Sequence, residues 1–314
     1  MDIILLGTGA DVPRHERPLT AMGLRMGRAV YLLDCGEGTQ LALAAQHVGL
    51  GGLRLVAITH LHAEQFLGLP GLLARRSQVA DAGPLTVVGP HGLEALVMPL
   101  LRGLAVRVPY ELRFVEVGGD APAKKAPMPV AWADDLLELR TLPLDHTVPT
   151  LGFRLVEHPR PGKFSAAAAR ARGLTPGPDF GRLQAGESVR APDGSEVLPD
   201  DVVGDPRSGR GVAYVSDTAA CPGLYRLLDD VDLAVVGGGW LPEYQAVAKA
   251  KKQLSLRDAA RVCSRAGARR ARFTQLSPRL PDERLDEADA LVAELHEHYR
   301  VGRVGDREGV VARD

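Results

Sequence analysis

Residues 59–73 read THLHAEQFLGLPGLL and directly follow the apolar run LRLVAI at 53–58. An apolar run of this length is typical of a buried strand. His60 and His62 stand two residues apart at its end, and side chains at i and i+2 of an extended chain point the same way. Both imidazoles can therefore reach one metal ion, so the stretch predicts a metal site at the end of a strand.

The two positions after these histidines break the pattern. A site for two metal ions would next need a carboxylate and a third imidazole, and the chain has Glu64 and Gln65 there. A glutamine amide oxygen is a neutral, weak ligand for zinc compared with imidazole. One half of a two-metal hydrolase signature is therefore intact, and the other half is altered.

Composition limits the class of protein. The 314 residues could form one large α/β domain or two small ones. A net charge of −1 excludes a molecule that is basic all over, so any nucleic-acid-binding surface must be local. Three irregularly spaced cysteines, Cys35, Cys221 and Cys263, favour a reducing compartment over a disulfide framework. With no stretch near the roughly 20 apolar residues of a membrane span, we expect a cytoplasmic protein.

Short apolar runs alternate with amphipathic stretches along most of the chain. We expect strands at 3–9, 29–36, 53–60, 85–90, 111–117, 137–144, 151–157, 211–217, 232–238 and 271–277. We expect helices at 39–48, 69–79, 91–103, 221–229, 242–250 and 255–267, another helix ending at Tyr299, and a small hairpin in 301–314. Strands joined in some places by hairpins and in others by helices indicate mixed sheets.

Residues 154–210 interrupt this alternation. The segment is rich in Pro, Gly and charge, and only a short helix at about 165–172 is expected inside it. Six Lys or Arg residues oppose two carboxylates between 154 and 182, a local charge of +4, and Phe164 and Phe180 lie among them. This mixture suits a surface that follows phosphates and stacks bases. The residues alone favour the simpler alternative, a solvated insertion whose two phenylalanines dock it on the body.

Seven stretches together carry a resemblance to a known family. They are GTGADVP (7–13), DCGEGTQ (34–40), THLHAEQFLGLPGLL (59–73), LDHTVPTLGFR (144–154), RPGKF with PGPDFGRL (within 160–183), AYVSDT (213–218) and FTQLSPR (273–279). In order and spacing the chain resembles ribonuclease Z, the tRNA 3′-processing endonuclease of the metallo-β-lactamase fold. The resemblance implies one αββα domain over 1–314, two mixed β-sheets flanked by helices, with a flexible, exosite-like arm inserted at about 155–195.

The resemblance also implies a first metal site. The matching positions are His60, His62, His146 and Asp217, and all four of the family's ligand types are present. Three neutral imidazoles and one carboxylate suit Zn²⁺ and leave room for a water. We therefore expect one zinc ion.

The family's second metal site is altered here. Its positions correspond to Glu64, Gln65, the shared Asp217 and Gln275, so two imidazoles are replaced by amides. We expect this second site to be weak or empty. Glu64 can still bind a metal or act as a general base, although its carboxylate reaches one methylene further than an aspartate.

The resemblance extends to proton transfer, and there too the chain departs from the family. In the family a His in an HST motif acts as the general acid, and Gln253 stands at that position. A glutamine cannot donate and recover a proton, and general acid catalysis is worth about 10²–10⁴-fold. The family's HEATF stretch is VGGGW here, which places Val236 and Gly237 where the family has His and Glu.

The RNA-binding arm of the family is better preserved. In ribonuclease Z a Gly-Pro motif on the arm grips the tRNA elbow and is presented to the other subunit of a homodimer. Gly177 and Pro178, followed by Phe180 and Arg182 and preceded by Lys163, match this arm. The resemblance therefore reverses the preference for a simple solvated insertion.

Three functions are compatible with these residues. The first is a slow metal-dependent endoribonuclease for tRNA precursors, in which Glu64 deprotonates a water that the ion acidifies. The second is a non-catalytic RNA-binding relative with one structural metal, acting as a homodimer or paired with an intact homologue. The third is a mononuclear hydrolase of a small ester, sulfate or phosphate, for which a tRNA-type arm would be unnecessary.

Overall fold

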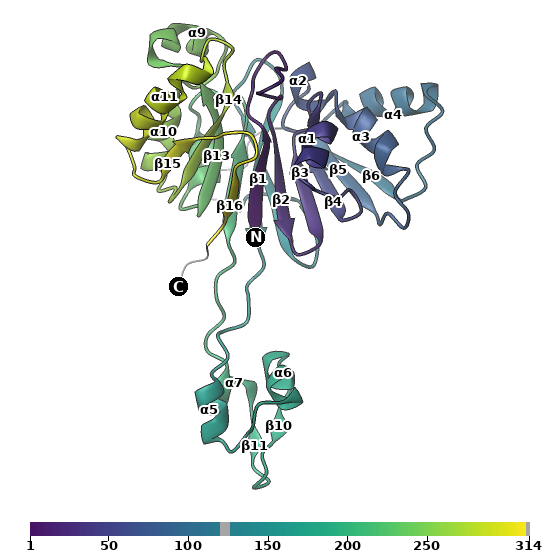
Figure 1. Ribbon diagram of the computed structural model, residues 1–314, viewed down its shortest axis with the longest axis vertical. Helices are drawn as coiled ribbons and strands as arrows, with labels where there is room; N and C mark the ends of the chain where they lie inside the picture. The colour runs from purple at the N-terminus through teal and green to yellow at the C-terminus, as the bar shows by residue number, and fades with distance from the viewer. Residues whose placement is uncertain (120–125, 312–314) are drawn as a thin grey trace. The chain divides into compact units, whose positions relative to one another are not determined.

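A computed structural model describes residues 1–119 and 126–311. The described chain divides into two compact units (Figure 1). The body consists of Met1–Val156 and Arg210–Val311, and the arm unit consists of Glu157–Gly209. No helix within the described ranges is long and apolar enough to cross a membrane.

The first sheet of the body has seven strands in the order β16-β1-β2-β3-β4-β5-β6. These are β1 Asp2–Gly7, β2 Ala21–Met26, β3 Ala29–Leu33, β4 Leu53–Ala57, β5 Leu85–Pro90, β6 Leu112–Val117 and β16 Arg307–Gly309. Strands β3 to β6 pair in parallel, and β16, β1, β2 and β3 pair antiparallel. The sheet is therefore mixed, as expected.

The second sheet also has seven strands, in the order β15-β14-β13-β12-β9-β8-β7. These are β7 Val130–Ala133, β8 Leu137–Leu144, β9 Thr150–Glu157, β12 Gly211–Val215, β13 Leu233–Gly239, β14 Ala271–Leu276 and β15 Tyr299–Val301. Strands β12 to β15 are parallel, while β12 pairs antiparallel with β9 and β7 pairs antiparallel with β8.

Helices cover the outer face of each sheet (Figure 1). They are α1 Thr39–Ala45, α2 Ala63–Phe66, α3 Leu69–Arg76, α4 Leu93–Gly103, α8 Pro222–Leu228, α9 Gln245–Ala250, α10 Leu256–Arg265 and α11 Leu285–Ala293, with short 3₁₀ turns at Pro242–Tyr244 and Asp282–Arg284. Ser255 caps α10 by accepting a hydrogen bond from the backbone N–H of Asp258 at 3.2 Å. The inner face of this helix buries Val262 and Cys263 against the sheet.

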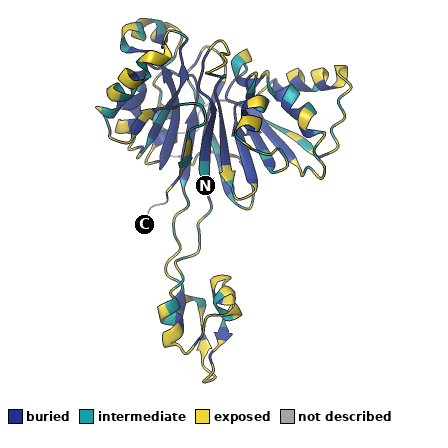
Figure 2. Cartoon of the chain, viewed as in Figure 1, coloured by how far each residue is buried: buried dark blue, intermediate teal, exposed yellow. Residues whose placement is uncertain are grey.

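The layers follow from the alternation of side chains along the strands. In β1, Ile3 and Leu5 belong to the apolar cluster between the sheets, which also contains Phe153 of the second sheet. Ile4 and Leu6 belong instead to the cluster beneath α1, α3 and α4. The central strands of both sheets are buried, the edge strands β6, β7 and β16 are half-buried or exposed, and the helices are exposed on their outer faces (Figure 2). The body is therefore an αββα sandwich, which confirms the expected fold class.

The arm unit has its own small core. Its elements are α5 Ala166–Ala171, α6 Pro178–Gln184, β10 Val189–Arg190, β11 Glu196–Val197 and α7 Pro199–Val202. Ala169, Leu174, Leu183, Val189, Ala191, Val197 and Val202 form its buried cluster. The expectation of a single short helix in this segment was wrong, because scattered small apolar residues build a core that its Pro and Gly content conceals.

The C-terminal tail also differs from the expectation. The hairpin expected in 301–314 does not form in the described residues, because Val301 ends β15, which pairs with β14, and β16 at the expected turn pairs with β1; residues 312–314 lie outside the described residues. The preceding helix ends at Ala293 rather than at Tyr299. Tyr299 begins β15, fully buried, and its hydroxyl donates to the backbone oxygen of Ala268 at 2.9 Å. Burial of this tyrosine in the second sheet explains why the chain is extended there.

Candidate metal centre

Four residues predicted as metal ligands converge where strands of both sheets end. His60 and His62 follow β4, His146 follows β8, and Asp217 follows β12. One ligand atom from each lies within 4.8 Å of all the others. His60 is fully buried and His146 and Asp217 nearly so, while His62 is half-buried. The structure thus brings together all four predicted ligands.

The side chains of this group fit a single metal ion. His60 Nε2 lies 3.1 Å from His62 Nδ1 and 3.7 Å from Asp217 Oδ2, and His146 Nε2 lies 3.9 Å from the same Asp217 oxygen. Nε2 of His146 is buried and has no hydrogen-bond partner among the described residues. A buried imidazole nitrogen normally has a partner, so this unpaired nitrogen and the donor set of three imidazoles and one carboxylate both suit zinc.

A buried hydrogen-bond relay orients His60. Asp34 is fully buried and accepts hydrogen bonds from the Thr59 backbone N–H at 2.8 Å, the Thr59 hydroxyl at 3.0 Å and the Tyr214 hydroxyl at 2.9 Å. Because the Thr59 hydroxyl donates to Asp34, it accepts from Nδ1 of His60 at 3.1 Å. This tautomer leaves the lone pair of His60 Nε2 facing the other ligands, as in carboxylate–histidine–metal sites.

A backbone carbonyl orients His146. Nδ1 of His146 donates to the carbonyl oxygen of Lys252 at 3.2 Å, which leaves Nε2 for a metal. Lys252 has φ = 51°, in the left-handed region that a lysine seldom adopts. Its ammonium is 2.8 Å from Asp145 Oδ1. The strained turn after α9 therefore presents a carbonyl to the metal centre.

Burial favours the neutral forms of His60 and His146. It lowers the pKa of His60 well below its usual value, and the charges of His62 and His146 lower it further. Burial also lowers the pKa of His146. Burial raises the pKa of Asp217 to about 7; a hydrogen bond from Gln253 opposes this rise, and the nearby charge of Glu64 adds to it. Neutral imidazoles are ready to bind a metal, and a cation would favour the ionised form of Asp217.

Gln275 serves a structural network. It has φ = 57°, its amide nitrogen donates to Ser216 Oγ at 2.7 Å, and its amide oxygen accepts from Thr20 Oγ1 at 3.1 Å. Both halves of the amide are therefore used to hold neighbouring backbone segments together. At this position, which was expected to have lost its role as a metal ligand, the amide forms hydrogen bonds with two hydroxyl groups.

Gln65 lies on a short helix that is tightly packed against the end of β3. It is fully buried on α2, and neither amide atom has a hydrogen-bond partner in the part of the chain that the structure describes. Its backbone oxygen accepts from the Cys35 N–H at 2.7 Å. A Cβ at Gly36 would overlap the Glu64 carbonyl oxygen, and one at Gly68 would overlap the Gly36 carbonyl oxygen. These close approaches fix the helix that carries Glu64 and Gln65.

Gln253 and Glu64 lie at the opening of the site. The amide oxygen of Gln253 accepts from Trp240 Nε1 at 2.8 Å, and the same side chain hydrogen-bonds Asp217. Glu64 Oε1 is 3.8 Å from His62 Nδ1. Both residues line a cavity of about 300 Å³ together with His62 and His146. The carboxylate of Glu64 is thus near the metal ligands. Gln253, which stands where the family has its proton donor, is beside Asp217.

The glycine stretch at 236–240 also packs against the site. Val236 is fully buried in the core, and a Cβ at Gly237 would overlap the Ser216 carbonyl oxygen. One at Gly239 would overlap the Gln275 carbonyl oxygen. These positions therefore support the loops of the site through backbone contact and offer no polar side chain.

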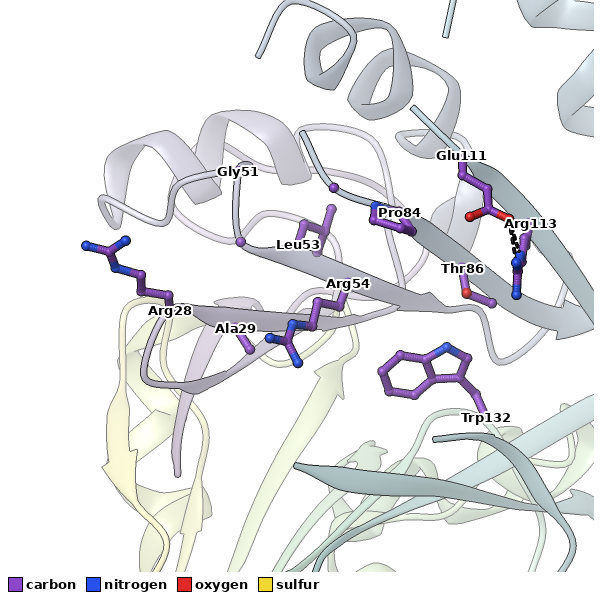
Figure 3. A pocket seen from close by; sticks show the side chains of 12 residues that line it. Arg28, Ala29, Gly51, Leu53, Arg54, Pro84, Thr86, Glu111, Arg113 and Trp132 are labelled. Carbon is purple, nitrogen blue, oxygen red and sulfur yellow. Dashed lines mark hydrogen bonds and ion pairs between the residues drawn. The ribbon is translucent and has the colours of Figure 1, made fainter. Parts of the chain in front are cut away.

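A further cavity, of about 660 Å³, lies away from these residues (Figure 3). It opens at the amino-terminal end of β4, beside Arg54 and Trp132, whereas His60 follows the other end of that strand. Arg54 is paired with Asp134 at 2.8 Å and with Asp135 at 2.5 Å. None of the residues that line it is a histidine or cysteine, so this cavity has no place in the metal chemistry.

The arm residues predicted to bind RNA all lie in the arm unit. Gly177 precedes α6, which Pro178 begins. Phe180 contacts Phe164, with ring centroids 4.8 Å apart, inside the arm unit. Arg182 pairs with Glu187 at 3.0 Å and with Asp179 at 3.5 Å, while Lys163 is exposed beside a cavity of about 560 Å³.

Sequence reasoning missed the residues that orient the ligands. Asp34 and Thr59 appear in the quoted motifs, yet their spacing gives no sign that they meet across two strands. The carbonyl of Lys252 has no sequence signal at all, because any residue has one. The polar residues inside the strand-end motifs DCGEG and TH were the available hint.

Comparisons with curated proteins give matches over most of the chain. The chain is 36% identical to ribonuclease Z of Salinibacter ruber, covering 98% of this chain and 96% of that protein. It is 33% identical to ribonuclease Z of Methanosarcina mazei, covering 90% and 89%, and 33% identical to ribonuclease BN of Escherichia coli O81, covering 90% and 91%. A scan against family models gives no match.

Comparisons with solved structures agree in fold. Human tRNase Z, short form, matches with a TM-score of 0.72 at 21% identity, covering 99% of this chain and all of that one. The metallo-β-lactamase fold protein YhfI of Bacillus subtilis matches with a TM-score of 0.65 at 14% identity, covering 98% of each chain. The fold, the convergent ligand group and the full-length sequence similarity agree: the chain belongs to the ribonuclease Z family.

Proposed function

We propose that this protein is a zinc-dependent endoribonuclease that acts on the 3′ ends of tRNA precursors through one metal ion, and that its turnover is slow. The observation that carries the proposal is the convergence of His60, His62, His146 and Asp217 within 4.8 Å in a chain of the ribonuclease Z family. The curated relatives named ribonuclease Z support the substrate class.

The chain's own residues divide the work of phosphodiester hydrolysis. A bound zinc ion would supply Lewis-acid charge and lower the pKa of a water towards about 7. The three histidines and Asp217 would hold the ion, and the relay from Asp34 through Thr59 fixes His60. Glu64 lies in the same cavity as His62 and His146, where its carboxylate can accept the proton of the attacking water.

Slow turnover follows from the groups that the site lacks. Gln275 is bound to Thr20 and Ser216, and Gln65 is buried on a fixed helix, so neither supplies an imidazole for a second ion. The charge that a second ion would place on the reacting phosphate is therefore missing. Gln253 cannot protonate the leaving oxygen, which must take its proton from water.

The arm unit completes the proposal. We infer that Lys163, Phe180 and Arg182 contact the tRNA body, and that the protein works as a homodimer in which the arm serves the partner's site. Residues 160–182 of the arm unit carry five Lys or Arg residues against one carboxylate, and this local positive charge supports phosphate binding, although the whole arm unit carries −1. The three free cysteines are consistent with work in the cytoplasm.

A cleavage assay tests this function. A 3′-extended tRNA precursor should be cut by the zinc-loaded protein, and cutting should stop when a chelator removes zinc. A Glu64→Gln variant should retain zinc and lose at least about 10²-fold in rate, the loss expected when a general base is removed.

Binding without cleavage under any metal would favour a second function, an RNA-binding relative with a structural metal. The hydrogen-bonded states of Gln253 and Gln275 are the observations that favour this alternative. Pairing with an intact homologue would then be required for cleavage, and adding such a homologue to the assay would detect it.

A further inference from the structure

A second cavity adjoins the metal centre through one shared residue. Gln253 lines the 300 Å³ cavity that holds His62 and His146, and it also lines a separate cavity of about 670 Å³. Residues of α8, α9 and α10, with Ala219, Ala220 and Leu254, form the rest of the second cavity, which we call the α9–α10 groove. A ligand that fills this groove therefore lies one side chain away from the reacting centre.

The groove carries uncompensated positive charge. Lys249 of α9 and Arg261 and Arg265 of α10 line it, with Asp258 as its one carboxylate. Asp258 accepts from Ser255 Oγ at 2.8 Å and lies 3.9 Å from Arg261. Among the described residues, no carboxylate pairs with Lys249 or Arg265. Three cations against one acid give the groove a charge of +2, although the whole chain carries −1.

An aromatic side chain lies in the same groove. Tyr225 of α8 lines it and is half-buried, packed on one side against the core beneath the second sheet. A tyrosine held in this way offers a ring face without the cost of ordering it. Cations that can contact phosphates, together with a fixed aromatic face, are the features of single-strand nucleic-acid binding.

We propose that the α9–α10 groove binds the single RNA strand next to the scissile phosphate. Lys249 and Arg265 contact its phosphates, and one unpaired base stacks on Tyr225. A single strand is favoured over a duplex because a paired base has no free face for a tyrosine. This inference rests on the proposed function, since it assigns the groove to the same substrate.

The charge contribution is tested with a Lys249→Ala/Arg265→Ala variant. The probe is a fluorescent oligouridylate, whose affinity is measured by anisotropy over a range of salt concentrations. Loss of two phosphate contacts should weaken binding roughly 10- to 30-fold at moderate salt and reduce the slope of log affinity against log salt by about 1.4. The matched control, Arg102→Ala/Arg257→Ala, removes two cations outside the groove and should leave both quantities unchanged.

The stacking contribution is tested at Tyr225. Tyr225→Leu should weaken oligouridylate binding at least about fivefold, and Tyr225→Phe, which retains the ring, should bind like the unchanged protein. If Tyr225→Leu has no effect and inorganic phosphate displaces the probe completely, the groove is a simple anion site and the proposal is wrong. An unchanged salt slope in the Lys249→Ala/Arg265→Ala variant would also overturn it.

Binding is measured both with zinc and with chelator, so the result does not depend on catalysis. If the precursor is never cleaved but the groove variants lose oligouridylate affinity, the proposed cleavage activity is wrong and the proposal that the groove binds single-stranded RNA is supported. If the unchanged protein cleaves the precursor and the groove variants bind and cleave like it, only the proposal that the groove binds single-stranded RNA is wrong. Circular dichroism and zinc content of each variant exclude misfolding as the cause of a loss.

Discussion

At the scale of single residues, the metal centre depends on groups that do not touch the metal. Asp34 is fully buried, and its carboxylate accepts hydrogen bonds from Thr59 and Tyr214. The Thr59 hydroxyl passes this orientation to His60, whose Nε2 faces the other ligands. Such supporting groups typically change metal affinity by 10- to 100-fold when they are removed.

Thr59→Val therefore has a defined expected effect. It retains the shape of the side chain but removes the hydroxyl between Asp34 and His60, so zinc affinity should fall about 10- to 100-fold in a competition titration. Thr59→Ser retains the hydroxyl and should bind zinc like the unchanged protein. Equal affinity in Thr59→Val would mean that another contact sets the ring of His60.

At the scale of elements, loops from different strands interlock through glycines beside the site. Gly36, which follows β3, and Gly68, which precedes α3, allow backbones to approach so closely that a Cβ at either would overlap a carbonyl oxygen. The Cys35 N–H donates to the Gln65 oxygen at 2.7 Å, and the Gly68 N–H donates to the Cys35 oxygen at 2.9 Å. The short helix α2 is thereby held against the end of β3.

Gly36→Ala should lower the free energy of unfolding by about 1–3 kcal/mol, the range for forcing extra atoms into a packed region. The added methyl group must push the Glu64 carbonyl away, so zinc affinity should fall as well. Gly49→Ala is the control, because a Cβ there meets no atom within 4 Å; its free energy of unfolding should change by less than about 0.5 kcal/mol. Denaturant unfolding measures both variants, and equal values would contradict the interlocking.

The elements also differ in how far the sequence could predict them. Runs such as IILLGTG (3–9) predict β1 because apolar residues fill both faces of a strand buried between two layers. The pattern does not indicate β2, whose AMGLRM includes Gly23 and Arg25, or the four-residue edge strand β7. The prediction of a hairpin in the C-terminal tail was wrong, because turn residues do not reveal that the strands on either side of them join different sheets.

The site was predictable to a different extent. The spacing of His60 and His62 already places them together, whereas His146 and Asp217 needed the family resemblance, because they come from distant strands. The relay through Asp34 could not be predicted, since it requires the position of Thr59 across two parallel strands.

At the scale of the whole molecule, the metal ligands lie in the body, and the arm proposed to contact tRNA is a separate unit. The arm unit contains its own core, and Arg160 and Arg207 exchange backbone hydrogen bonds of 2.9 Å at its base. Replacing the residues between these two with a short Gly-Ser linker should leave zinc affinity unchanged and reduce tRNA affinity at least about tenfold, because several phosphate contacts are lost. Unchanged tRNA affinity in a gel-shift titration would show that the arm does not bind tRNA.

The claim that one metal ion serves this site is tested most directly by the zinc content of the purified, zinc-saturated protein. Elemental analysis should find one equivalent per chain, because Gln65 and Gln275 supply no imidazole to a second ion. A Gln65→His/Gln253→His/Gln275→His variant provides the comparison, and it should bind a second equivalent and cleave precursor tRNA faster. Two equivalents of zinc in the unchanged protein would contradict the claim that the site holds one metal ion.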